Sequence, residues 1–139
     1  MNIEGLDAIT IKYKKNKIKY LTDDENEEIK EYFGEIVSDD KLFGQKFVEM
    51  NRVICYIIIN GEKTELISHY EGFKINETLE IKLKGLKNVD DFSHMFFGCP
   101  SLISLPDISK LNTINVTSLK VFWMFFFISI PRYFKLGYQ

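Results

Sequence analysis

From Val89 to Leu111 the chain carries an apolar residue at nearly every third position, with a single four-residue step. The members of this apolar row are Val89, Phe92, Met95, Cys99, Leu102, Leu105, Ile108 and Leu111. A helix repeats its apolar residues about every 3.6 positions and a strand about every 2, so neither fits this spacing. A solenoid coil that is part helix and part strand does fit it. The segment is therefore predicted to be one coil of a stacked repeat.

The pattern begins again after this coil. Residues 88–92 (NVDDF) are echoed 27 positions later by residues 115–119 (NVTSL), and Leu105-Pro106 is echoed 25 positions later by Ile130-Pro131. This period lies within the range of leucine-rich repeats, roughly 20–29 residues. The sequence thus predicts one good coil over 88–113 and a degenerate second coil over 115–139.

Residues 89–113, VDDFSHMFFGCPSLISLPDISKLNT, resemble the BspA-like leucine-rich repeats of bacterial and protist surface proteins. Residues 42–49, 57–62 and 79–86 are similar to the leader that precedes such repeats in protist proteins. The resemblance implies an interaction scaffold without chemistry. It also implies that Leu102 and Leu105 point inward, whereas the residues around them contact a partner. These candidate contacts are Ser101, Ile103, Ser104 and Asp107.

The first 84 residues alternate between strand and helix patterns. Residues 8–21 have the alternation of a hairpin, and Thr22 with Glu25 forms a capping-box sequence that starts a helix. Asn60-Gly61 suits a type I′ turn between strands at 53–59 and 62–67. Residues 79–83 alternate like a half-buried strand. The apolar stripe of the helix is expected to contain Ile29, Tyr32, Phe33, Ile36 and Val37.

The predicted fold class is therefore α+β. A small mixed sheet with one amphipathic helix is expected to continue into one or two leucine-rich-repeat solenoid coils. The predicted units are an N-terminal cap domain over 1–84 and a repeat segment over 85–139. The last strand of the cap would seed the stack, because an unpaired first coil would expose its apolar row to water.

Charge and cysteine content limit the function classes. The formal net charge is −2, so nucleic acid is not expected as a partner. The two cysteines, Cys55 and Cys99, lie in apolar surroundings and are predicted to be buried, reduced thiols. Residues 1–7 lack the basic and apolar parts of a secretory signal, so a cytoplasmic location is predicted.

Few residues suggest chemistry. Adjacent serine and histidine occur twice, as Ser68-His69 and Ser93-His94, but neighbouring side chains diverge on a strand or a helix. Two histidines and two buried thiols supply few zinc ligands. No catalytic residue, cofactor or metal site is assigned, and the chain is predicted to be a non-catalytic protein-interaction module with a protein partner. An enzyme with an unrecognised site remains an alternative.

The segment 121–130 (VFWMFFFISI) departs from the repeat and must be buried somewhere. As a helix of ten residues it would measure about 15 Å, whereas a bilayer core is about 30 Å thick. A full membrane span is therefore not expected. The alternatives are a lid on the first coil, self-association through 121–130, attachment of 121–134 to a membrane surface, and a fragment of a longer repeat protein.

Overall fold

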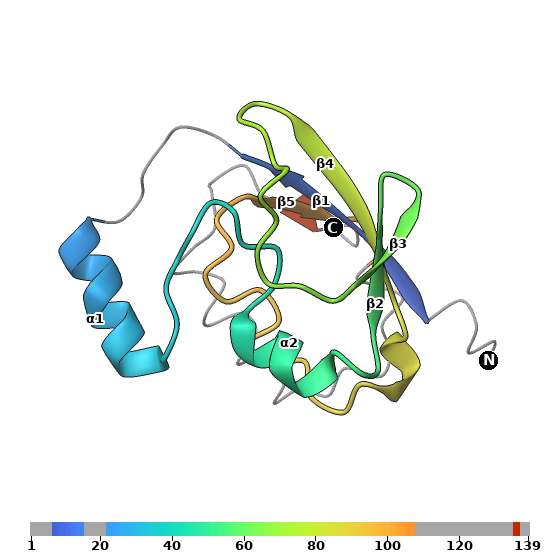
Figure 1. Cartoon of the computed structure of the whole chain (residues 1–139), viewed down its shortest axis with the longest axis horizontal. Helices are drawn as coiled ribbons and strands as arrows, with labels where there is room; N and C mark the ends of the chain where they lie inside the picture. Colours follow the sequence, from blue (N-terminus) through green and yellow to red (C-terminus); the bar gives the residue numbers. More distant parts are fainter. Residues whose placement is uncertain (1–6, 16–21, 108–134, 137–139) are drawn as a thin grey trace.

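The computed structural model describes residues 7–15, 22–107 and 135–136. Within these ranges the chain forms one sheet with the strand order β3-β2-β4-β1-β5-β6 (Figure 1). The strands are β1 (Ala8–Lys14), β2 (Tyr56–Ile59), β3 (Glu62–Glu65), β4 (Thr78–Lys84), β5 (Leu102–Leu105) and β6 (Lys135–Leu136). The first five strands pair antiparallel, and β6 lies parallel to β5.

Alternating side chains give the sheet an apolar inner face. Ile11 of β1 lies opposite Ile81 of β4, which in turn lies opposite Ile59 of β2, and all three are buried. Successive residues of a strand point to opposite faces, so the polar residues between them occupy the outer face. The first arm of the hairpin predicted over 8–21 is confirmed as a strand, and so is the strand predicted at 79–83.

The hairpin of β2 and β3 is also confirmed. Asn60 and Gly61 join the two strands with φ angles of 52° and 80°, as a type I′ turn requires. The predicted limits are too wide, because β2 begins only at Tyr56. Val53, the first residue of the strand predicted at 53–59, is instead 92% exposed in the turn before β2.

Two helices accompany the sheet, where the sequence analysis predicted one. Helix α1 (Asp23–Phe33) begins at the predicted capping box: the Thr22 hydroxyl accepts from the backbone N–H of Glu25, and the Glu25 carboxylate accepts from that of Thr22. It ends at Gly34, whose φ is 87°. Helix α2 (Gln45–Asn51) buries Phe47 and Val48 in the core. In Figure 1, α1 stands apart from the sheet, at the left of the view.

The predicted solenoid is wrong. Residues 86–101 form a short 3₁₀ helix, η2 (Leu86–Asn88), followed by turns, and β5 then runs antiparallel to β1 in the same sheet as the N-terminal strands. A solenoid stacks successive coils side by side, whereas this segment folds over the inner face and completes one core. The predicted inward residues are nevertheless buried, and each of Val89, Phe92, Met95, Cys99, Leu102 and Leu105 is at most 7% exposed.

Several sequence-based expectations fall outside the described residues. They concern the second arm of the first hairpin at 16–21, the last two members of the apolar row, most of the second coil, and the segments 121–130 and 121–134. The predicted domain boundary after residue 84 also stays a prediction, although β1 and β5 pair across it.

Candidate functional site

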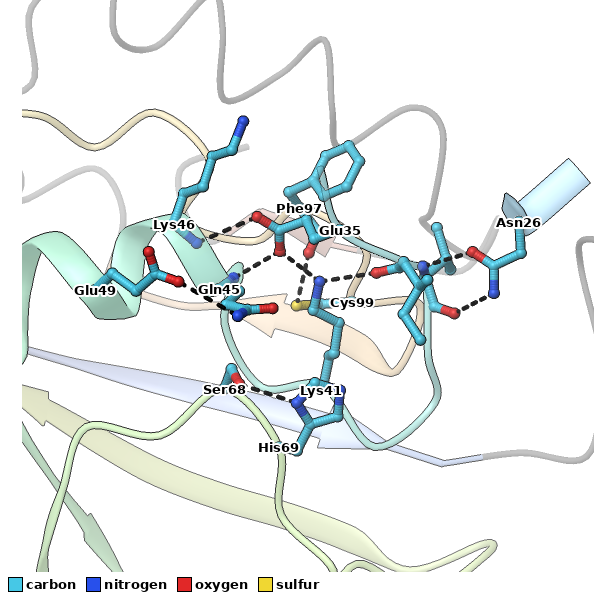
Figure 2. A network of polar contacts seen from close by, with 12 residues as sticks. Asn26, Glu35, Lys41, Gln45, Lys46, Glu49, Ser68, His69, Phe97 and Cys99 are labelled. Carbon is cyan, nitrogen blue, oxygen red and sulfur yellow. Dashed lines mark hydrogen bonds and ion pairs between the residues drawn. The ribbon is translucent and has the colours of Figure 1, made fainter. Parts of the chain in front are cut away.

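The most elaborate polar arrangement among the described residues surrounds the start of α2 (Figure 2). The Lys41 ammonium lies 2.5 Å from a carboxylate oxygen of Glu35, and the two side chains are only 1% and 2% exposed. The same carboxylate accepts hydrogen bonds from the backbone N–H groups of Gln45 at 2.6 Å and Lys46 at 3.2 Å. Glu35 therefore caps α2, whose own N-cap residue, Gly44, has no side chain to do so.

The rest of this arrangement surrounds the ammonium group. Lys41 Nζ also donates to the backbone carbonyl of Ile36 at 2.8 Å, and it lies 5.5 Å from the centre of the Phe97 ring. Two of the three N–H donors of the ammonium are therefore hydrogen-bonded within the chain, and the aromatic ring lies over the same group. We conclude that the buried pair of Glu35 and Lys41 is structural, because it joins the start of α2 to the segment that precedes the helix.

A serine and a histidine meet next to this pair. Ser68 Oγ lies 2.9 Å from His69 Nδ1, so the expectation that these neighbours point apart is wrong for this pair. Burial lowers the pKa of His69, and the nearby ammonium of Lys41 acts in the same direction. Within the described ranges, no carboxylate hydrogen-bonds the imidazole to orient it as the third member of a catalytic triad.

The Ser68 and His69 pair borders a cleft of about 380 Å³ between α2 and residues 66–69. Helix α2 contributes Gln45, Val48 and Glu49, which are spaced three and four residues apart on one face, and Arg52 follows the helix. The cleft contains one acidic and one basic side chain, so its charge indicates no particular ligand. Its residues do not form a recognisable catalytic group, and the absence of enzymatic activity stays a prediction.

The four predicted partner contacts lie in different environments. Ser101 is buried, and its hydroxyl donates to the backbone carbonyl of Asp39 at 2.7 Å. The carboxylate of Asp107 accepts from the backbone N–H of Thr10 at 2.9 Å. Ile103 and Ser104, both in β5, are half-buried. Two of the four side chains therefore hold the fold together, and a partner role for any of them stays a prediction.

The surface of α1 around Tyr32 is the one that sequence reasoning missed, and Ile29 and Phe33 beside it are half-buried. The helix buries none of its residues, and Tyr32 is 84% exposed. One end is held by Phe33, whose ring centre lies 5.2 Å from that of Phe97. The Asn26 side chain also exchanges two hydrogen bonds with the backbone of Val37. The sequence predicted an apolar stripe that continues through Ile36 and Val37, but the helix ends at Phe33.

The cysteines are buried as predicted, and both are free thiols. Burial raises the pKa of Cys55 to about 11 and that of Cys99 to about 12. Such thiols are protonated at neutral pH and are poor nucleophiles and metal ligands. Across the described part of the chain, no three His, Cys, Asp or Glu side chains gather closely enough to hold a metal ion.

Comparison with protein-family models, curated proteins and solved structures finds no match to this chain. In the portion that the structure describes, no helix combines the length and apolar character needed to cross a bilayer. Functional inference therefore depends on the chain's own surfaces.

Proposed function

We propose that the chain is a non-catalytic protein-interaction module and that α1 is the element that contacts its partner. The observation that carries this proposal is an amphipathic helix of 11 residues with no buried residue and with Tyr32 84% exposed. Isolated helices shorter than about 12–15 residues are marginal in water, because most helical stability in proteins comes from packing. A partner that covered Ile29 and Tyr32 would supply this packing.

The charge of α1 indicates the chemistry of the partner. The helix sequence DDENEEIKEYF contains six acidic residues and one lysine, a net charge of −5. Ile29 and Tyr32 are three residues apart, and Glu25 and Glu28 lie one turn before them on the same side of the helix. A complementary surface therefore has an apolar centre for Tyr32, surrounded by basic groups. Aromatic anchors of this kind dominate the binding energy of many protein interfaces.

The resemblance of residues 89–113 to BspA-like repeats supports the same class of function, because the family implies interaction scaffolds. The alternative of a peripheral membrane protein depends on 121–134, which lies outside the described residues, so it stays a prediction. The described acidic helix does not favour it, since anionic membrane surfaces attract basic segments.

The test compares the proteins that bind to the wild-type chain, and are purified with it, with those that are purified with each of two variants. Tyr32→Ala removes the exposed ring and leaves a good helix former, so the fold is expected to persist. Val53→Ala is the matched control, because it shortens a side chain that is also exposed, at 92%, but lies away from α1. A partner recovered by the wild type and the control, and lost with Tyr32→Ala, is the expected result. The same set of proteins with all three chains would refute the proposal.

A further inference from the structure

The outer face of the sheet carries lysines around an apolar centre. Tyr56 and Ile58 of β2 point to this face, because Ile57 and Ile59 between and beside them are buried. Lys84 and Lys82 of β4 lie directly opposite Tyr56 and Ile58 in the strand pairing. By the same alternation, the outer face also carries Lys63 of β3 and Lys12 and Lys14 of β1.

The charge of this outer face is opposite to that of α1. The strands place on it five lysines, Lys12, Lys14, Lys63, Lys82 and Lys84, and two glutamates, Glu65 and Glu80, a net charge of +3. Lys63 Nζ lies 4.3 Å from the centre of the Tyr56 ring, and Lys12 lies 3.8 Å from Glu80 in a pair that is 42% and 56% exposed. These contacts are at the surface, so the lysines remain accessible.

We propose that α1 of one copy docks on the outer sheet face of a second copy of this chain. Two independent features of the molecule support this pairing: an acidic helix that exposes Tyr32 beside the half-buried Ile29, and a basic sheet face with Tyr56 and Ile58 at its centre. A helix packed on a sheet face is a common two-layer arrangement. The proposal rests on the proposed function, because it identifies the partner of α1.

The spacing of the charges agrees with this docking. Acidic residues on the helix surface recur every three or four positions, which corresponds to about 4.5–6 Å along its axis. Lys82 and Lys84 are two positions apart in a strand, which corresponds to about 6.6–6.8 Å. Glu28 and Glu31 can therefore face this pair of lysines while Tyr32 lies near Tyr56. A contact between the two tyrosine rings would stabilise the docked pair beyond the contribution of the apolar area that they bury.

Such a contact joins two different surfaces, so it is heterologous and head-to-tail. Each copy that uses its helix still offers its sheet face to another copy, and the assembly closes into a ring or grows into a chain. Because the contact is between exposed charges, it weakens when salt screens them. Self-association that decreases between 50 mM and 500 mM NaCl is therefore expected.

The experiment exchanges the charges of the two surfaces and measures molar mass by light scattering on the full chain. The helix variant combines Glu28→Lys in the middle of α1 with Glu31→Lys in its last turn, where a basic residue is favourable. The sheet variant combines Lys82→Glu with Lys84→Glu. Each variant alone is expected to associate at least tenfold more weakly than the wild type, because like charges then face each other.

Mixing the two variants provides the decisive measurement. In the mixture, the basic helix of one variant meets the acidic sheet face of the other, and the unchanged surfaces are also complementary. Association at low salt is therefore expected to return to the wild-type level. A wild type that stays monomeric at 0.5 mM, or a mixture that fails to associate, would overturn the proposal.

Two other outcomes separate this inference from its alternatives. Association that is unchanged in both variants would assign self-contact to another surface, such as 121–130, and would overturn the pairing proposed here. If the wild type is monomeric but a different protein still binds in a Tyr32-dependent manner, the second copy is the wrong partner while the proposed function stands. Circular dichroism of each variant confirms that the fold is retained.

Discussion

Replacing Lys41 with methionine should destabilise the protein far more than replacing a surface lysine. In the native fold the ammonium is 2.5 Å from Glu35 and the pair is almost completely buried. Methionine has a similar length but no charge, so the carboxylate would stay buried without its cation. Breaking a buried ion pair in this way typically costs about 3–5 kcal/mol. A small protein has a total free energy of unfolding of about 5–15 kcal/mol, so this loss is a large fraction of it.

The assay is equilibrium unfolding in urea, and the matched control is Lys12→Met. Lys12 and Glu80 form a surface pair at 3.8 Å with side chains 42% and 56% exposed. Such pairs contribute between zero and about 1 kcal/mol, so the control should unfold close to the wild-type midpoint. A further variant that combines Glu35→Gln with Lys41→Met removes the unpaired charge. The double variant should lose less free energy of unfolding than the losses of the two single variants, Glu35→Gln and Lys41→Met, add up to.

A loss in the free energy of unfolding that is no larger for Lys41→Met than for Lys12→Met would contradict this prediction. That result would mean that the carboxylate keeps its solvation by other means, and that the pair does not join α2 to the rest of the chain. A variant of Lys41 that fails to unfold cooperatively would agree with the prediction, because the start of α2 depends on this carboxylate.

Three further predictions concern packing, pH and thiol reactivity. Gly44→Ala should lower the free energy of unfolding, measured in urea, by more than about 3 kcal/mol, because the added Cβ would lie 1.9 Å from the backbone oxygen of His94. A loss below about 1 kcal/mol would contradict this packing. Burial lowers the pKa of His69 and of His94 below the reference value of 6.5. Below that pH the unfolded chain therefore binds more protons than the folded chain does. The free energy of unfolding should consequently fall from pH 7 to pH 5. The variant His69→Gln should flatten that slope, and an unchanged slope would refute the assignment. A thiol reagent at pH 8 should modify Cys55 and Cys99 only after denaturation, and rapid labelling of the native chain would disprove their burial.

Local features of the sequence predicted the local features of the fold. The capping box at Thr22, the turn at Asn60-Gly61 and the alternation in β4 were all confirmed, because each depends on residues within a few positions of one another. Helix α2 was missed, since its seven residues are too few to establish a helical period.

The candidate site was much harder to predict. Glutamate and lysine are rarely buried, so nothing in the local sequence indicated that Glu35 and Lys41 form a buried pair. The apolar pattern of α1 was visible, but its exposure depends on which parts of the chain pack against it. Ser101 illustrates the converse, because a position predicted to contact a partner instead donates to Asp39, 62 residues away.

The amino-acid sequence by itself determined that the apolar row from Val89 to Leu105 leaves water, and its members are buried in the fold. Hydrophobicity requires burial, but it does not specify the neighbour that provides it. Only the tertiary structure decided that β5 pairs antiparallel with β1, about ninety residues earlier in the chain, instead of stacking in a solenoid. The same long-range choice leaves α1 exposed on one side of the molecule and the lysine-rich sheet face on another.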